Sequence, residues 1–128
     1  MKATATRTGT YKHVVQVRQH RLQADEPHDT GGEDSAPSPQ ELLAASLASC
    51  TAITMEMYAE RKGWDVGDLE VVVEADTGAK PARFEVLLKL PESLDDEQAR
   101  RLQVIAHKCP IHRILLAEAE IVDRIERV

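Results

Sequence analysis

The sequence predicts an α+β fold, and three features support this prediction. Strand-forming residues are concentrated in 10–24, and again in 66–76 and 82–90. An uncharged segment, 42–55, lies between these regions and has helix signals on both sides. A second helical pattern follows at 95–107. Strands, a long helix, strands and a further helix in this order are typical of α+β domains.

The first strand region, 10–24, alternates only in part and turns polar around Arg18 and Gln19. We therefore expect either one long strand or a hairpin that turns at these residues. The next segment, 25–38, is rich in proline, glycine and aspartate. It predicts a loop of about 14 residues, a length that is often functional or mobile in a compact domain.

The central helix is expected over 39–62, because both of its ends carry local signals. Ser38 and Glu41 fit a capping box with a proline at the first helical position, and Gly63 is a natural stop. The uncharged part, 42–55, is too short to span a bilayer and indicates a buried core helix. At about 1.5 Å per residue the helix is about 35 Å long. One small chain cannot cover all its sides, which favours a homodimer.

The remaining elements follow from shorter patterns. The segments 66–76 and 82–90 are joined by residues that include glycine and proline, so an antiparallel pair is expected. Acidic residues and an apolar face predict the helix at 95–107. After a proline break we expect a helical turn at 111–117 and a last strand at 121–128.

Length and charge narrow the function. A chain of 128 residues predicts a single domain, 1–128. Its net charge is −6, and its cations alternate with carboxylates, which argues against a nucleic-acid partner. We expect no membrane span and no secretory signal, and therefore a cytoplasmic protein. In that compartment two cysteines are thiols, metal ligands or a redox pair rather than a structural disulfide.

The two cysteines occupy different local settings. Cys50 lies within the uncharged helix, where it is either a functional thiol or a small buried core residue. Cys109 precedes Pro110 and is expected to cap the next helical turn, with His112 nearby; alternatively it is an ordinary cysteine at a helix break. Helix N-termini stabilise thiolates. The residues that share a helical face with Cys50 are Leu43, Leu47, Thr54 and Met57.

Metal binding is a further alternative for this region. His107, Cys109 and His112 are possible ligands, and Cys50 would have to complete the set. Their spacing across a proline break does not match a standard zinc pattern, so we expect no metal. The chain also has no glycine-rich phosphate loop and no nucleophile elbow, so we expect no cofactor.

Several motifs resemble those of a known family. Residues 37–51, continued by 58–64, closely resemble the OsmC/Ohr family, which comprises osmotically inducible protein C and organic hydroperoxide resistance proteins. The segment 108–113 resembles that family's second cysteine motif. Residues 20–27 and 31–34 look like a less-studied OsmC-like branch.

The resemblance implies an OsmC-like fold, in which two chains form an intertwined homodimer. Two long buried helices would pack between antiparallel sheets built from both chains. It also implies reduction of small organic hydroperoxides by cysteine chemistry. Cys50 would be the peroxidatic thiolate, and Cys109 would resolve its sulfenic acid as a disulfide. An external thiol, of the lipoyl type in the best-known branch, would reduce the pair.

The family's activating residues are only partly matched. In the hydroperoxide-resistance branch a glutamate stands where this chain has Gln40, and it pairs with an arginine that activates the thiolate. Glu41 is one residue later and about 100° around the helix, so its expected role is in the capping box. The arginine is expected from the N-terminal strands, with Arg21 preferred to Arg18.

The expected substrate pocket is apolar, which would favour an alkyl hydroperoxide over hydrogen peroxide. Two other functions stay open on the same fold: a dimer that binds a hydrophobic ligand without catalysis, and a thiol redox sensor. His112 is expected to support Cys109. The residues expected to line the pocket are Leu43, Leu47, Met55 and Met57.

Overall fold

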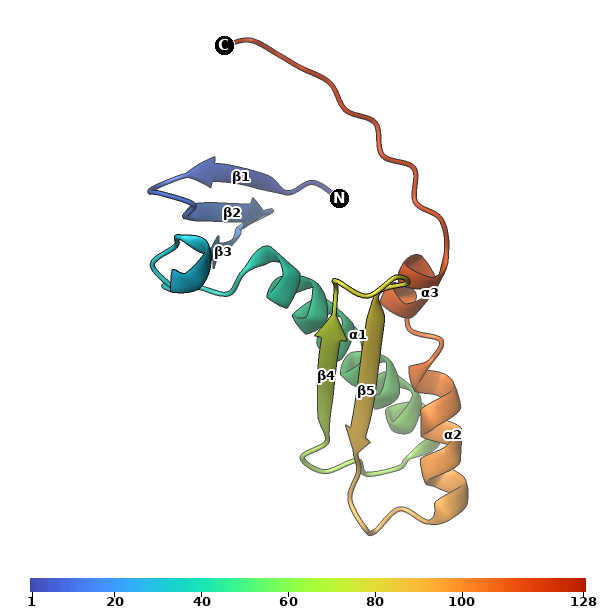
Figure 1. Cartoon of the computed structure of the whole chain (residues 1–128). Coiled ribbons are helices and arrows are strands. Elements are labelled where there is room, and N and C mark those ends of the chain that lie inside the picture. The colour runs from blue at the N-terminus through green and yellow to red at the C-terminus, as the bar shows by residue number, and fades with distance from the viewer. The chain divides into compact units, whose positions relative to one another are not determined.

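The computed structural model describes all 128 residues and confirms the α+β class, with two small antiparallel sheets and three α-helices (Figure 1). The chain divides into two compact units. Unit 1 consists of Met1–Ala45 and Ala75–Arg83, and unit 2 consists of Ser46–Glu74 and Phe84–Val128. Each unit therefore contains two separate parts of the sequence.

Unit 1 contains a three-stranded antiparallel sheet in the order β1-β2-β3. Its strands are β1 (Thr4–Arg7), β2 (His13–Val17) and β3 (His20–Ala24). The hairpin alternative is thus confirmed, because β2 and β3 are joined by a turn in which Arg18 has φ 54°. Strand β1 was not predicted, because it is short and polar and has no alternation of apolar residues.

The loop after β3 is confirmed and is organised around a buried carboxylate. Asp25 is 1% exposed, and its Oδ2 accepts hydrogen bonds from the Ser35 hydroxyl at 2.6 Å and the Ser35 N–H at 3.1 Å. The Ser35 hydroxyl is the main cause that lowers the pKa of Asp25 to about 2. The loop also includes a short 3₁₀ helix, His28–Thr30, and a close approach at Gly32, where a Cβ atom would lie 1.9 Å from the Glu26 carbonyl oxygen.

Helix α1 (Pro39–Lys62) has the bounds that the sequence predicts. The capping box is present: the Glu41 N–H donates to Ser38 Oγ at 3.2 Å, and the Ser38 N–H donates to Glu41 Oε1 at 3.0 Å. The Ser38 N–H, and after it the Ser38 side chain, lower the pKa of the Glu41 carboxyl group, because hydrogen bonds to the carboxylate stabilise its charged form. The helix ends before Gly63, whose φ of 71° is easily adopted only by a residue without a side chain.

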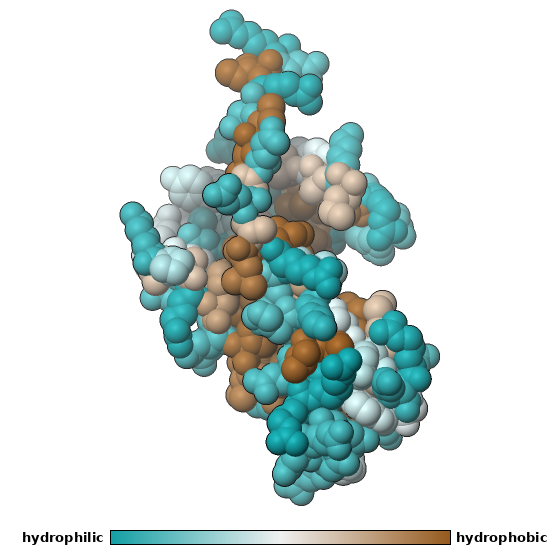
Figure 2. Space-filling model, turned by 90° about the vertical axis from the view of Figure 1, so that its right-hand side faces the viewer, coloured by the Kyte–Doolittle hydropathy of each residue, from teal (hydrophilic) through white to brown (hydrophobic).

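The single chain buries only one stripe of α1. Fully covered side chains recur every fourth residue, at Leu47, Thr51, Met55 and Ala59. Other apolar residues of the helix are exposed, namely Leu43, Ile53 and Met57. By length and composition alone α1 could cross a membrane, but the core helix of a soluble protein meets the same criterion. Hydrophobic residues are also visible at the surface in Figure 2.

Strands β4 (Glu70–Asp76) and β5 (Arg83–Lys89) form the second sheet and run in opposite directions (Figure 1). The prediction placed the start of β4 too early, at residue 66. The chain instead turns at Gly67, where φ is 54° and the N–H donates to Asp65 Oδ1 at 2.8 Å.

The core of unit 2 lies between α1 and α2 (Asp96–Ala106), which run alongside each other in Figure 1. Helix α2 is confirmed and begins at a capping box formed by Asp95 and Gln98. Its residue Arg101 donates from Nε to the Tyr58 hydroxyl of α1 at 2.9 Å. The buried residues of this core are Met55, Ala59, Leu102 and Ala106.

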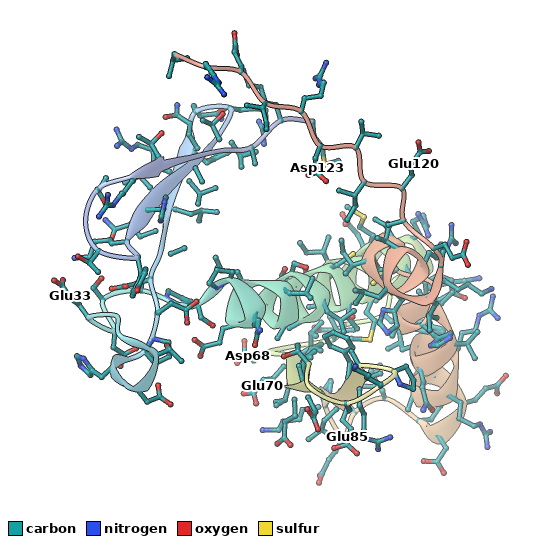
Figure 3. All side chains as sticks on the ribbon, turned by 45° about the horizontal axis from the view of Figure 1, so that its top comes forward. Glu33, Asp68, Glu70, Glu85, Glu120 and Asp123 are labelled. Atoms are coloured by element: carbon teal, nitrogen blue, oxygen red, sulfur yellow. The ribbon has the colours of Figure 1, made fainter.

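Helix α3 (Pro110–Leu116) confirms the predicted helical turn, but the strand predicted at 121–128 is wrong. This segment forms no strand and extends away from α3 in Figure 1. A strand requires a neighbouring edge for its N–H and C=O groups, and this segment pairs with none in the single chain. Figure 3 shows Glu120 and Asp123 along it. Its exposed apolar residues are Ile121, Val122, Ile125 and Val128.

Candidate active site

Cys50 lies on α1 next to the buried stripe and is half-buried. Burial is the main cause that raises the pKa of its thiol, because a charged sulfur loses hydration. Two hydrogen bonds act in the opposite direction: the Ile111 N–H and the Thr54 hydroxyl donate to the sulfur and favour its charged form. Desolvation therefore raises the pKa of the Cys50 thiol, while these two donors lower it and can stabilise a thiolate.

Cys109 is fully buried and caps α3, as the sequence predicts. Its backbone is extended, with φ −62° and ψ 148°, and Pro110 opens the helix after it. The sulfur accepts a hydrogen bond from the His112 N–H at 3.3 Å. The ring of the same histidine contacts the same sulfur, with 2.8 Å between Sγ and Nδ1. Cys109 thus has two contacts with one residue of its own helix.

The fold brings the two cysteines together within unit 2. The Cys50 thiol donates a hydrogen bond to Cys109, which stabilises the protonated form of Cys50 and adds to the rise of its pKa. Both cysteines are reduced. A sulfenic acid formed on either sulfur would have the second thiol as a neighbour, and such a pair condenses readily to a disulfide.

A third group, Thr51, contacts the second sulfur from α1. Its hydroxyl lies 3.9 Å from Cys109 Sγ and donates to the Leu47 carbonyl at 2.7 Å. Thr51 was not predicted as part of the site. The sequence places Thr54 on the same side of the helix as Cys50, one turn later, but does not give it a role. The Ile111 N–H is expected near the Cys109 sulfur at the start of the helical turn, whereas here it acts on Cys50.

The two residues at the start of α1 have local roles in unit 1. Glu41 belongs to the capping box, as predicted. Gln40 accepts a hydrogen bond from the Thr77 hydroxyl at 2.9 Å through Oε1. Arg18 and Arg21 also belong to unit 1, in the β2–β3 turn and in β3 respectively. Their role beside Cys50 therefore stays a prediction.

The four residues predicted to line a substrate pocket differ in burial. Leu47 and Met55 are fully buried, whereas Leu43 is 39% exposed and Met57 is 57% exposed. Met55 and Met57 are about 200° apart around the helix and so face different sides. Leu47 also belongs to the buried stripe, while Leu43 and Met57 lie outside it.

The two histidines of this region, His107 and His112, contact each other and do not point toward a common metal-binding position. The rings of His107 and His112 meet edge to face, with their centroids 5.3 Å apart. Burial, together with the nearby His107, lowers the pKa of His112 and favours its neutral form. No group of three or more histidine, cysteine, aspartate or glutamate side chains is arranged to hold a metal ion.

Solved structures share this fold over most of the chain. One is a protein from Psychrobacter arcticus that is described as an osmotic stress induced and detoxification response protein. Its sequence is 25% identical to this chain, the match covers 88% of this chain and 86% of that chain, and the TM-score is 0.74. A proposed organic hydroperoxide resistance protein of Vibrio cholerae, with captopril bound in one of its active sites, is also 25% identical, with 88% and 83% covered and a TM-score of 0.64. An organic hydroperoxide resistance protein of Legionella pneumophila is 22% identical, with 88% of each chain covered and a TM-score of 0.59.

No curated protein sequence matches the chain. A family comparison does match: residues 32–122 fit the family described as OsmC-like protein. The matched range includes α1, both cysteines and His112. It covers well over half of the sequence. The chain belongs to the OsmC-like protein family.

Proposed function

We propose that this protein is a thiol-dependent reductase of small organic hydroperoxides. Cys50 is the peroxidatic cysteine and Cys109 is the resolving cysteine. The observation that carries the proposal is that α1 meets the start of α3 at the two cysteines inside unit 2: Cys109 Sγ lies 3.9 Å from the hydroxyl of Thr51, the residue after Cys50, and the neighbouring Cys109 adds to the rise of the Cys50 pKa. Relatives described as organic hydroperoxide resistance proteins support the substrate class.

In the first step the Cys50 thiolate attacks one oxygen of the hydroperoxide. The O–O bond breaks, the alkoxide takes up a proton and leaves as an alcohol, and Cys50 becomes a sulfenic acid. Cys50 suits this step because it is half-buried, whereas Cys109 is 0% exposed and so less accessible to a peroxide. The donors from Ile111 and Thr54 stabilise the attacking thiolate.

In the second step the Cys109 sulfur attacks the Cys50 sulfur, and the hydroxide leaves as water. The product is a Cys50–Cys109 disulfide, which protects Cys50 from further oxidation. An external dithiol of the lipoyl type then supplies two electrons and two protons and restores both thiols. No metal or other cofactor takes part in this scheme.

We also propose that the working form is a homodimer in the cytoplasm, with one OsmC-like domain in each chain. Three separate features support a second copy: the exposed apolar residues of α1, the exposed strands β1 and β3, and the unpaired segment 121–128. The Vibrio cholerae relative is described as having more than one active site. A second copy would also complete the covering of α1.

The thiolate-activating arginine remains part of this proposal. Arg21 is preferred because it lies in the stretch of sequence that resembles the family branch, and it is paired with Gln16 in the β2–β3 ladder. Arg18 has a positive φ in the turn, so it already has a backbone role there. A guanidinium beside Cys50 would oppose the rise in pKa that burial causes.

The test is the intact mass of the reduced protein after one equivalent of cumene hydroperoxide. We expect a loss of about 2 Da, from the disulfide, before any gain of about 32 Da from over-oxidation. Peptide mapping should join Cys50 to Cys109. Repeated turnover should follow when dihydrolipoamide is added as reductant.

Two variants serve as controls. Cys50→Ser should consume no peroxide above background, whereas Cys109→Ser should react once and accumulate oxidised Cys50. Equal consumption by Cys50→Ser and the unaltered protein would refute the proposal. A disulfide that forms but that no dithiol reduces would instead indicate a redox sensor.

A further inference from the structure

Cys50, Cys109 and His112 are neighbours in unit 2. The Cys50 thiol donates to Cys109, and Cys109 Sγ lies 2.8 Å from His112 Nδ1. Cys109 is 0% exposed, so a proton that leaves its sulfur cannot pass directly to bulk water. The imidazole nitrogen is the titratable group that contacts this sulfur and can accept a proton near neutral pH.

We propose that His112 is the general base of the disulfide-forming step and returns the proton to the departing hydroxide. This inference rests on the proposed function and assigns a catalytic residue to its second half-reaction. His112 qualifies as catalytic because its ring touches the sulfur that reacts.

In this step the proton of Cys109 is transferred twice. The Cys109 S–H bond breaks, and its proton moves to His112 Nδ1. The electron pair left on the Cys109 sulfur forms the bond to the Cys50 sulfur while the S–O bond of the sulfenic acid breaks. The leaving hydroxide takes the proton from the imidazolium and becomes water. Cys50 sulfenic acid and Cys109 thiol thus give one disulfide and one water, and His112 ends neutral.

The surroundings of His112 suit a base rather than a fixed cation. Burial and His107, whose ring meets it edge to face, lower the pKa of His112 and favour its neutral ring. For Nδ1 to accept, the ring proton must lie on Nε2. The other groups that face the Cys109 sulfur are the Cys50 thiol and the Thr51 hydroxyl, both from α1.

The contact exceeds what a helix cap requires. A capping sulfur at Cys109 needs only the backbone N–H of His112, which it has at 3.3 Å. The ring contact at 2.8 Å is a second interaction that capping does not explain. Because the ring and the N–H both belong to His112, the first turn of α3 positions the Cys109 sulfur and the imidazole base together.

The experiment separates the two half-reactions by rapid quench, with dimedone to trap sulfenic acid and intact mass to follow the disulfide. His112→Asn places an amide near the former Nδ1 but cannot take up a proton. We expect sulfenic acid to form within about twofold of the normal rate and the disulfide to form at least about tenfold more slowly. The normal rise of the second rate with pH, as His112 becomes neutral, should be lost.

His107→Asn is the matched control, because it removes a neighbouring imidazole that has no contact with either sulfur. We expect its second rate at high pH to stay within about twofold of normal. Its pH midpoint should move upward, because His107 lowers the pKa of His112. Thermal unfolding of both variants checks that they are folded.

Normal disulfide formation by His112→Asn would overturn the inference, and so would an equal slowing of both steps, which would indicate a structural role.

Diamide tests the role of His112 without peroxide. Cys50 adds to the diazene, and Cys109 then displaces the reduced hydrazine to form the same disulfide. If peroxide fails but His112→Asn still slows the diamide reaction, only the proposed function is wrong. If peroxide works and neither oxidant shows the effect, only the role of His112 is wrong.

Discussion

Asp25 shows how a single side chain organises a loop of unit 1. Its carboxylate is 1% exposed and accepts hydrogen bonds from Ser35 and from the Glu26 N–H, the latter at 2.7 Å. These donors favour the charged form, which explains a pKa of about 2 against the ordinary 3.8. The loop therefore depends on this carboxylate remaining ionised.

Asp25 gives a prediction about the pH dependence of stability. Because its folded pKa is depressed, its contribution is fully present above the unfolded value of about 4 and is lost as pH falls toward about 2. Urea midpoints measured from pH 6 to pH 2 should fall over this window. In Asp25→Asn this part of the decline should be missing.

Asp34→Asn is the matched control, since it makes the same chemical change at an exposed position of the same loop. It should retain the normal pH dependence. An identical decline in Asp25→Asn and the unaltered protein would contradict the prediction.

At the residue scale the sequence predicts what is local and misses what is not. The cap at Cys109 was predictable, because a cysteine before a proline at a helix start has few other conformations. The approach of His112 Nδ1 to the sulfur depends on a side-chain torsion that no pattern specifies. The hydrogen bond between Cys50 and Cys109 depends on how α1 and α3 pack, so the residues supported it only through a family resemblance.

At the scale of elements, the ends of α1 were predicted because each end is coded within four residues. Ser38 and Glu41 exchange two hydrogen bonds at one end, and Gly63 supplies a positive φ at the other. Strand β1 was missed because it is short and polar, although its partner β2 follows closely in the sequence. The strand at 121–128 was mispredicted because a strand exists only with a partner, and this segment has none in the single chain.

The capping box makes a prediction about stability. Ser38→Ala removes the hydroxyl that accepts the Glu41 N–H and should lower the free energy of unfolding by about 1 kcal/mol. Chemical denaturation measures this difference. Ser93→Ala, at an exposed position before α2, should change stability by less than about 0.5 kcal/mol. Equal effects of the two substitutions would show that the cap contributes nothing.

For the whole molecule, the central question is what covers the exposed side of α1. Ile53 is 49% exposed and Met57 is 57% exposed, although both lie in a largely uncharged helix. Burial of such side chains is worth about 1.5–3 kcal/mol each. A second copy that covers both side chains would therefore add several kcal/mol of favourable apolar burial, on the order of 3–6 kcal/mol for the two.

Ile53→Lys tests this covering. In a dimer that buries Ile53 the added charge would be desolvated, so the variant should dissociate at concentrations where the normal protein is dimeric. Light scattering coupled to size exclusion measures the mass. Gln103→Lys, an exposed position on α2, should leave the mass unchanged. A normal protein that already has the mass of one chain would exclude the dimer.

The exposed side of α1 also sets a condition on biosynthesis. For the proposed homodimer, a newly made chain would hold its apolar helix surface in water until it met a second copy, and that interval would lengthen as expression falls. During this time the surface is open to chaperones and to aggregation with unrelated chains. The yield of assembled protein in a cell should therefore depend on the local concentration of newly made chains.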